Sequence, residues 1–366
     1  MTAYNDSYKV MSKFESDIKD LFDDAPFVIG IVHRQDLDGV GSGAMIEKVC
    51  ERFNKRSIIL YSNYDREDAE RLYNQLSDAI KRYGIYKFLA IVSDISINEQ
   101  AVDLYKKVFE LIEASNGKLV FLDHHAFSER VVEILNRYAD IYIIGDDPEN
   151  TGATLTYREF ARKLIGFDKA LFKIYAIALA TDLGLFTVKE TESFDTLYKV
   201  ISYANDIVGV ENKDEADRIL DKVKDLLKSG SSVNDNKELL EITERYKREE
   251  EKILNDIISK SIYIEKGRYK VAVATSLGKY DLDASVVCDT LKLKYPESNL
   301  RVYIKNAGQV RLRSNGDIDC ARISKAFGGN GHIGAAGFVL KDIDKNNIDA
   351  INDLIDRIIS IADKLN

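Results

Sequence analysis

The sequence predicts a two-domain α/β protein whose larger domain is built on a parallel sheet. Short apolar runs alternate with helical runs through the first half of the chain, and after about residue 188 the composition shifts toward Asp, Glu and Lys. A length of 366 residues also favours two domains over one. We expect a parallel five-stranded sheet domain over residues 1–187, a helical connector over 188–260 and a smaller α/β domain over 261–366.

Five apolar runs are predicted as strands of the first domain, at residues 27–32, 57–61, 86–92, 118–122 and 141–144. Helical runs are predicted between and after them, at residues 44–53, 66–83, 98–115, 127–137, 152–165 and 169–180. Strands that alternate with helices at this spacing pair in parallel, with helices on both faces of the sheet. A further amphipathic helix is predicted at residues 7–22, because its apolar residues recur at helical spacing, namely Val10, Met11, Phe14, Ile18 and Leu21.

The second half of the chain begins with charged helical periodicity. Residues 211–259 carry apolar residues at helical spacing among many charges, which is typical of a solvated helical connector. Strands are then predicted at 269–275, 300–305 and 308–313, and helices at 283–294, 317–326 and 347–364. A glycine-rich turn lies between the last two helices.

Composition limits the function classes. The net charge of −9, from 52 basic and 61 acidic residues, argues against a surface that holds long nucleic acid non-specifically. It does not exclude a small basic pocket. No apolar run is long enough to span a membrane, and the N-terminus lacks the pattern of a signal peptide, so we expect a cytoplasmic protein. The three cysteines, Cys50, Cys288 and Cys320, are far apart and are predicted as core thiols.

The first chemistry-bearing motif follows the first predicted strand. His33, Asp36 and Asp38 lie on the turn that leaves it, where an open α/β sheet places its functional groups. Two carboxylates two residues apart repel each other unless a cation lies between them, and a divalent metal is the simplest candidate. The alternative is that both aspartates form the turn and cap the next helix.

Further motifs follow later elements, and those that end strands fall at the same edge of the predicted sheet. Asp94 ends the third strand, Asp123, His124 and His125 end the fourth, and Asp182 ends an apolar helix. All four histidines of the chain, the fourth being His332, lie in turns beside Asp or Gly. Helix capping explains a single aspartate but not the histidines. Carboxylates and imidazoles in this number favour two divalent cations, Mn²⁺ with Mg²⁺ as an alternative, as in two-metal phosphoester hydrolysis.

These motifs resemble those of the DHH phosphoesterase family, which includes RecJ nucleases and nanoRNases. Asp123-His124-His125 resembles the triplet that names the family; the run from His33 to Ser42, Asp94 and the run from Thr181 to Gly184 resemble its other motifs. The step of three residues from His33 to Asp36 differs from that of many members, so His33 is expected to bind its metal at a different angle or less tightly.

The resemblance implies a role for each of these residues. His33, Asp36 and Asp94 would hold one metal, and Asp38, Asp94, His124 and Asp182 the other, with Asp94 bridging. His125 would face the scissile phosphate, and Asp123 would orient a ligand histidine. The catalytic residues would thus be Asp94, Asp123 and His125. Ser42 and Thr151 could contact phosphate at helix N-termini, but capping is the favoured role for both.

The far end of the chain resembles the DHH-associated domain. The run from Phe327 to Phe338 resembles its glycine-rich turn with a histidine, with Asn330 in place of one usual glycine. Arg311 and Arg313 lie just upstream and alternate on a strand, so they share a face. Substrate binding is therefore expected from residues of this region: Arg311, Arg313, Gly329, Gly331 and His332.

The resemblance implies a Mn²⁺-dependent phosphodiesterase that hydrolyses single-stranded or short oligonucleotides to nucleoside 5′-monophosphates by a two-metal mechanism. Three alternatives stay open: a cyclic-dinucleotide phosphodiesterase or 3′-phosphoadenosine 5′-phosphate phosphatase, a RecJ-like nuclease within a replication or repair assembly, and a non-catalytic scaffold on the same fold. A pyrophosphatase is disfavoured by the glycine–histidine turn. The expected partners are RNA, DNA or a small nucleotide, with no membrane; a homodimer or a replication-protein partner is left open.

Overall fold

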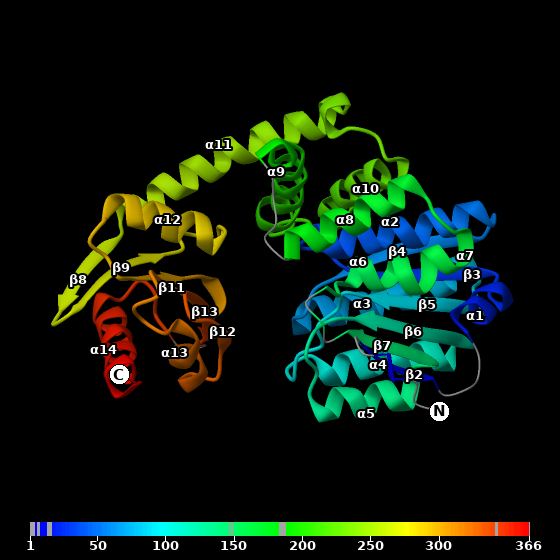
Figure 1. Ribbon diagram of the computed structural model, residues 1–366, viewed down its shortest axis with the longest axis horizontal. Helices are drawn as coiled ribbons and strands as arrows, with labels where there is room; N and C mark the ends of the chain where they lie inside the picture. The colour runs from blue at the N-terminus through cyan, green and yellow to red at the C-terminus, as the bar shows by residue number, and fades with distance from the viewer. Residues whose placement is uncertain are drawn as a thin grey trace. The chain divides into compact units, whose positions relative to one another are not determined.

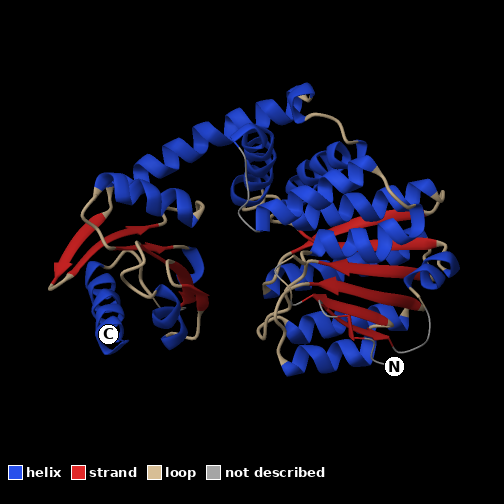
Figure 2. Cartoon of the chain, in the orientation of Figure 1, coloured by secondary structure: helices blue, strands red, loops and turns tan. Residues whose placement is uncertain are grey.

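The chain forms two compact units, Met1–Thr243 and Glu244–Asn366, in this computed structural model (Figure 1). Each unit contains its own sheet flanked by helices (Figure 2). The structure describes residues 4–5, 8–12, 17–145, 147, 149–182, 188–340 and 343–365.

The first unit contains the predicted five-stranded parallel sheet, in the order β7-β6-β5-β3-β4. Its strands are β3 (Phe27–His33), β4 (Arg56–Ser62), β5 (Phe88–Ser93), β6 (Gly117–Asp123) and β7 (Ile141–Gly145). Every residue of β3 and β5 is buried, because both faces of the sheet are covered. The α/β fold class expected from the sequence is confirmed.

The predicted helix over residues 7–22 is wrong at residues 8–12 and confirmed at residues 18–22, while residues 7 and 13–16 lie outside the described part of the chain. Residues 8–12 form strand β2 (Tyr8–Ser12), which follows the short strand β1 (Tyr4–Asn5), and residues 18–22 belong to helix α1 (Ile18–Asp24). β2 pairs antiparallel with β7 and extends the sheet to seven strands. The few apolar residues of this segment fit the periodicity of a helix and that of a strand equally well, and pairing with β7 favours the strand. Phe14 lies outside the described residues.

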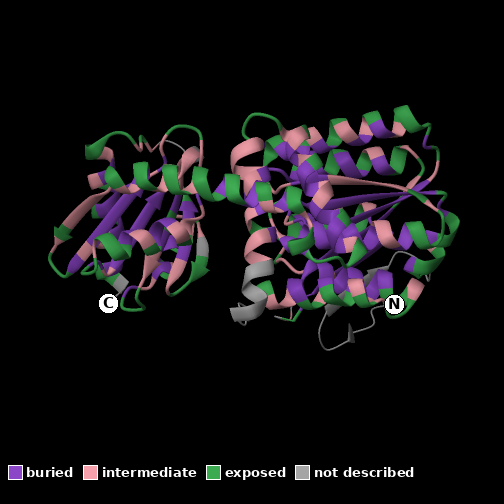
Figure 3. Cartoon of the chain, turned by 90° about the horizontal axis from the view of Figure 1, so that it is seen from above, coloured by how far each residue is buried: buried purple, intermediate pink, exposed green. Residues whose placement is uncertain are grey.

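Helices cover both faces of the first sheet, and the buried residues lie between them and the strands (Figure 3). On one face lie α3 (Arg66–Tyr83), α4 (Val102–Ala114) and α5 (Glu129–Tyr138). The other face carries α1, α2 (Leu37–Arg52), α6 (Gly152–Leu155), the π-helix η1 (Thr156–Ala161), α7 (Arg162–Ile165) and α8 (Lys169–Asp182).

Helix α2 begins at Leu37, seven residues before the predicted start at 44. Its glycines serve close packing instead of a turn: a β-carbon at Gly39 would lie 2.2 Å from the carbonyl oxygen of His33, and one at Gly41 would lie 2.6 Å from Ile174. Ser42 is therefore buried inside the helix, where it accepts a hydrogen bond from Ser93. Both roles suggested for Ser42, the favoured helix cap and the phosphate contact at a helix N-terminus, are therefore wrong, because Asp36 caps α2.

Residues 188–243 pack on the core of the first unit. They form α9 (Val188–Ser202), the π-helix η2 (Tyr203–Val208), α10 (Lys213–Ser229), the short 3-10 helix η3 (Val233–Asp235) and the start of α11 (Lys237–Ser259). Apolar side chains of α9 and α10, such as Val200 and Leu220, are fully buried in that core. Helix α11 starts in the first unit and ends in the second.

The second unit contains a mixed six-stranded sheet in the order β12-β13-β11-β10-β9-β8. Its strands are β8 (Ile262–Lys266), β9 (Tyr269–Thr275), β10 (Leu300–Ile304), β11 (Gln309–Ser314), β12 (Asn330–His332) and β13 (Ala335–Val339). Its helices are α12 (Ala284–Lys294), the short η4 (Asn306–Gly308), α13 (Cys320–Ala326) and α14 (Ile348–Leu365). One face packs on α13 and α14, whereas α12 and the end of α11 cover part of the other.

The cysteines are confirmed as core thiols: Cys50, Cys288 and Cys320 are free and buried. Among the described helices, none combines the length and the apolar character that crossing a membrane requires.

Candidate metal centre and anion-binding face

The carboxyl edge of the first sheet collects the predicted motif residues. His33 ends β3, Asp94 follows β5, and Asp123 ends β6 with His124 and His125 directly after it. In the sheet, β5 lies between β3 and β6. Parallel strands present their carboxyl ends at one edge. Asp94 is therefore placed centrally, between the histidine of β3 and the histidines that follow β6.

The first group of side chains consists of His33, Asp36 and Asp94. Nδ1 of His33 lies 2.8 Å from Oδ2 of Asp36 and 3.5 Å from Oδ2 of Asp94. The other oxygen of Asp36 accepts a hydrogen bond from the backbone N–H of Gly39 and caps α2. Asp36 is thus a helix cap, which was the alternative to metal binding considered from the sequence. It also belongs to this group with His33 and Asp94.

Asp38 faces the same centre from the first turn of α2. Its carboxylate accepts hydrogen bonds from the Thr151 hydroxyl at 2.7 Å and from the backbone N–H groups of Gly152 and Ala153 at 2.8 and 2.6 Å. Its Oδ2 lies 3.8 Å from Nε2 of His124. Thr151 also caps α6, as expected. The start of α6 therefore fixes the direction of the Asp38 carboxylate.

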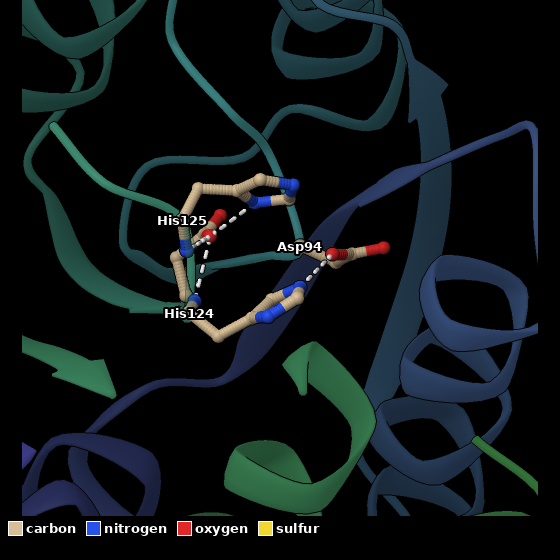
Figure 4. A group of neighbouring side chains, drawn as sticks. Asp94, His124 and His125 are labelled. Carbon is tan, nitrogen blue, oxygen red and sulfur yellow. Dashed lines mark hydrogen bonds and ion pairs between the residues drawn. The ribbon is translucent and has the colours of Figure 1, made fainter. Parts of the chain in front are cut away.

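The second group contains Asp94, Asp123, His124 and His125. Figure 4 shows the His124 imidazole directed at Asp94, and its Nε2 lies 3.4 Å from Oδ1 of Asp94. Asp123 is fully buried; its Oδ1 accepts hydrogen bonds from the backbone N–H groups of both histidines and lies 2.7 Å from Nδ1 of His125. Neither Asp94 nor Asp123 is the N-cap of the helix that follows it.

The proximity of carboxylates and imidazoles shifts their pKa values. Burial lowers the pKa of His33, but Asp36 and Asp94 outweigh it and hold the pKa well above its usual range. Against the same burial effect, Asp94 and Asp38 raise the pKa of His124 to about 10. Burial and the neighbouring carboxylates of Asp94 and Asp36 raise the pKa of Asp38. Close packing of like charges is thus a defining property of this centre.

The residues present fit divalent cations. Three buried polar atoms of this centre have no hydrogen-bond partner within the described residues: Nε2 of His33, Oδ2 of Asp94 and Oδ2 of Asp123. The donor atoms within each of two overlapping groups, which share Asp94, lie within 4.8 Å of one another. Carboxylate oxygens with some imidazole nitrogen are ligands that suit Mn²⁺ or Mg²⁺. Asp182 is the last residue of α8, and its side chain lies outside the described part of the structure.

The backbone at Asp94 adopts an uncommon conformation. Its φ of 59° lies in the left-handed region, which costs an ordinary residue about 1–2 kcal/mol. Gly152 packs against it so closely that a β-carbon there would lie 2.4 Å from Cβ of Asp94. The conformation of Asp94 is therefore maintained by the approach of α6.

Sequence reasoning missed two residues of this region. Tyr64 follows β4; its ring stacks on His33 with centroids 4.3 Å apart, and its hydroxyl lies 3.1 Å from Nδ1 of His33. Arg34 is buried beside His33 and lies 3.3 Å from Asp217 of α10. The sequence offered one sign for Tyr64, its position directly after a predicted parallel strand. No sequence feature pointed to Arg34.

The second unit presents Arg311 and Arg313 on one face of its sheet. Arg311 lies opposite Gly337 and Arg313 opposite Ala335 in the β11–β13 pair, and His332 lies opposite Ala335 on the other side. Residues opposite each other share a face of the sheet. The two arginines and His332 therefore project on the same side, over small residues of β13. Arg311 and His332 are exposed.

The glycine-rich turn is a tight hairpin of β12 and β13. A β-carbon at Gly329 would lie 2.2 Å from the carbonyl oxygen of Gly337, and one at Gly331 would lie 2.4 Å from Cα of Ala336. Gly331 also has a φ of 144°. These two glycines allow β12 to approach its partner, which places His332 in the row of Arg313.

Comparisons with known proteins agree with this architecture. Residues 268–361 match the family described as the DHHA1 domain. An exopolyphosphatase-related protein from Bacteroides fragilis has a similar structure, with a TM-score of 0.53 at 16% identity over 95% of this chain and 96% of that one. None of the curated protein sequences matches this chain.

Two further solved structures are similar. RecJ from Thermus thermophilus in complex with Mn²⁺ has a TM-score of 0.52 at 14% identity over 94% of this chain, which corresponds to 53% of RecJ. CDC45 from Entamoeba histolytica has a TM-score of 0.50 at 9% identity, over 93% of this chain and 97% of that one. Together with the DHHA1 match, these structures confirm the resemblance seen in the sequence: the chain has the fold of RecJ and of the exopolyphosphatase-related protein, and its residues 268–361 match the DHHA1 domain.

Proposed function

We propose that the chain is a divalent-metal-dependent phosphodiesterase that hydrolyses single-stranded or short oligonucleotides to nucleoside 5′-monophosphates. The observation that carries the proposal is the convergence of His33, Asp94 and the Asp123–His125 turn at one sheet edge. So many ionisable groups in one buried place are costly unless cations neutralise the carboxylates.

The proposed metal ligands are His33, Asp36 and Asp94 for one ion, and Asp38, Asp94, His124 and Asp182 for the other. Bound divalent cations would supply Lewis-acid activation of a water and neutralise charge that develops on the phosphoryl group. Mn²⁺ is favoured because the similar RecJ structure contains it. The short His33–Asp36 contact supports a shared role for these two residues at one ion.

Asp123 and His125 act together on the substrate in this proposal. Oδ1 of Asp123 accepts from Nδ1–H of His125, so Nε2 of the ring is left to face the substrate. Burial lowers the pKa of His125, but Asp123 outweighs it and raises the pKa above the usual value. A protonated His125 can donate a hydrogen bond to a phosphate oxygen and pass a proton to the leaving oxygen.

Arg311, Arg313 and His332 would bind phosphate groups of the substrate. Guanidinium groups bind phosphate through paired hydrogen bonds. Gly329 and Gly331 contribute through the hairpin that places His332 beside Arg313. A free phosphodiester, with a charged backbone on each side of the scissile bond, fits this cationic face better than pyrophosphate.

The proposal is tested by measuring hydrolysis with Mn²⁺ over a panel of substrates, with Asp94→Asn as the matched inactive variant. The panel contains a dinucleotide, a 5-mer and a 24-mer in RNA and DNA, cyclic di-AMP and 3′-phosphoadenosine 5′-phosphate. Turnover of long strands indicates a RecJ-like exonuclease, and turnover of the shortest strands alone a nanoRNase-like enzyme. Turnover of only the last two compounds contradicts the oligonucleotide substrate. No turnover by protein that binds Mn²⁺ contradicts the enzyme and favours a scaffold.

We also propose a cellular setting for the chain. Free, buried thiols at Cys50, Cys288 and Cys320 fit a reducing compartment, so the cytoplasm stays our expectation. A homodimer or a replication-protein partner stays open.

A further inference from the structure

We propose that the first unit carries a second binding site for single-stranded nucleic acid, separate from the metal centre. We call it the 167–173 surface. It consists of exposed side chains from α2, α7 and α8 and the loop before α8: Arg52, Arg162, Phe167, Lys169, Phe172 and Lys173. The proposal deepens the proposed function and rests on it, because it concerns how longer strands of that substrate class are held.

Aromatic rings form the centre of the 167–173 surface. Phe167 and Phe172 are 71% and 44% exposed, and their ring centroids lie 5.6 Å apart. Phe172 in turn stacks on Tyr175, with an interplanar angle of 13°, while the buried Tyr157 supports Phe172 and Tyr175 at 6.1 and 5.2 Å. Aromatic faces that are held in place yet open to solvent are the platforms on which unpaired bases stack.

Uncompensated cations surround these rings. Arg52, Arg162, Lys169 and Lys173 are exposed and form no ion pair within the described residues. The acidic side chains nearby are already paired in three ion pairs: Asp168 with Lys48 at 3.0 Å, Glu51 with Lys228 at 2.6 Å and Glu159 with Lys163 at 2.8 Å. The local charge is therefore positive although the whole chain is acidic. A polyanion is the ligand that fits this charge.

A surface pocket beside Phe167 gives the site a shape. It has a volume of about 400 Å³ and is lined by Lys48, Glu51, Arg52, Ile165, Phe167 and Asp168. The ring of Phe167 forms one wall, and Arg52 supplies a guanidinium that forms no ion pair within the described residues. A nucleotide can therefore stack its base on Phe167 while its phosphate contacts Arg52.

The 167–173 surface is remote from the metal centre. The helical run of α6, η1 and α7 starts at Gly152, whose N–H contacts Asp38, and ends at Ile165, next to Phe167 (Figure 1). At a rise of about 1.5 Å per residue, this run separates the two by roughly 20 Å. A dinucleotide cannot reach both, so the surface assists only longer strands.

The test measures binding by the fluorescence anisotropy of a labelled 20-nucleotide polyuridylate, with the full chain in EDTA. All variants are made in an Arg311→Ala/Arg313→Ala background, which removes binding by the second unit. Phe167→Ala/Phe172→Ala is expected to weaken binding by about tenfold or more, because each stacked base is lost. Lys169→Gln/Lys173→Gln is expected to reduce the slope of log affinity against log salt by about 0.7 per cation.

Matched controls are Tyr86→Ala, at an exposed aromatic elsewhere in the first unit, and Lys107→Gln on α4. Both should bind as the background does. Equal binding by the phenylalanine variant and the controls overturns the proposal. The proposal is also overturned if the unchanged 167–173 surface binds no nucleic-acid strand and instead drives self-association, or binds an acidic protein through Phe167. These binding measurements use no metal, so they do not depend on hydrolysis. A failure of the phosphodiesterase proposal would appear instead as absent hydrolysis by a protein that still binds the strand.

Discussion

The metal centre of the first unit and the arginine face of the second differ most in burial. His33, Asp94 and Asp123 are almost completely buried, and His33 lies 3.5 Å from Asp94, whereas Arg311 and His332 lie exposed on an open part of a sheet. Charges withdrawn from water must be neutralised locally, but exposed arginines are stabilised by solvent until a ligand arrives. Under the proposed function, the first region therefore needs cations to neutralise its buried carboxylates, whereas the second can exchange an anionic ligand with solvent.

The strongest test of this difference is Asp94→Asn. The substitution removes the carboxylate shared by both groups of the centre while it preserves shape and backbone preference. We expect the hydrolysis rate to fall by about 10³-fold or more, because several kcal/mol of charge stabilisation is lost. Isothermal titration with Mn²⁺ should also show lost binding, with phosphate binding by the second unit unchanged. Retained activity would contradict the metal assignment.

The two regions should respond differently to pH. In the metal-free centre, the neighbouring carboxylates outweigh burial and raise the pKa of His33, and they raise that of His124 to about 10, so both imidazoles bind protons more tightly than a free imidazole does. Metal binding must displace these protons, and the affinity for Mn²⁺ should rise by up to about tenfold per pH unit for each proton displaced. Arginine stays charged throughout this range.

Titrations with Mn²⁺ at pH 6, 7 and 8, in buffers of different ionisation enthalpy, measure the protons released. Inorganic phosphate titrated into the Asp94→Asn variant serves as the control for the second unit, with allowance for the ionisation of phosphate itself. An affinity for Mn²⁺ that does not change with pH would contradict the proton competition.

Asp123→Asn separates positioning from metal binding. Asp123 holds the His125 ring and both backbone N–H groups of the turn. Partners of this kind are worth about 10–100-fold in activity. We expect kcat to fall by that factor, with a smaller change in KM and a loss of the raised pKa of His125 in the pH profile of kcat. In the paired variant His125→Gln, the same ionisation should disappear from the pH profile of kcat. Different pH profiles for Asp123→Asn and His125→Gln would argue against joint action of these two residues.

Arg311→Ala should affect binding more than chemistry. A hydrogen bond to a charged group contributes about 1.5–3 kcal/mol, so KM should rise by roughly 10-fold or more, with kcat less changed. Steady-state kinetics on a short oligonucleotide measures both. Arg322→Ala, an arginine of the same unit on α13, is the matched control. Equal effects of the two substitutions would contradict a specific phosphate contact.

The smallest effect is expected from Tyr64→Phe. The substitution keeps the ring that stacks on His33 and removes only the hydroxyl beside Nδ1. A hydrogen bond of this kind contributes about 0.5–1.5 kcal/mol, so activity should fall by about 2- to 13-fold. Tyr64→Ala should cost more, because the stacking is lost as well; if both substitutions have equal effects in the kinetic assay, the stacking is unimportant.

The sequence predicts much of this molecule because burial on both faces leaves a clear signal. Runs such as that in β3 are apolar throughout, and the topology then places Asp94 and Asp123 at one edge. The prediction was wrong where a local pattern has two solutions. Residues 8–12 fit a helix by their sequence alone, but in the fold they pair with β7 as a strand. The glycines of α2 suggest a turn, but in the fold they allow close packing within a helix. Tyr64 was missed because only the fold brings its ring onto His33.

The left-handed backbone at Asp94 restricts which residues evolution or engineering can place there. Glutamate would keep the charge, but its longer side chain starts from a backbone conformation that asparagine, aspartate and glycine tolerate best. The β-carbon of residue 94 also leaves no room for one at Gly152. A substitution library that is selected only for folding, and not for catalysis, should therefore retain only a few residue types at position 94 and glycine at position 152. Folding alone would then preserve Gly152 and restrict position 94 to a few residue types, even in lineages that no longer use the centre.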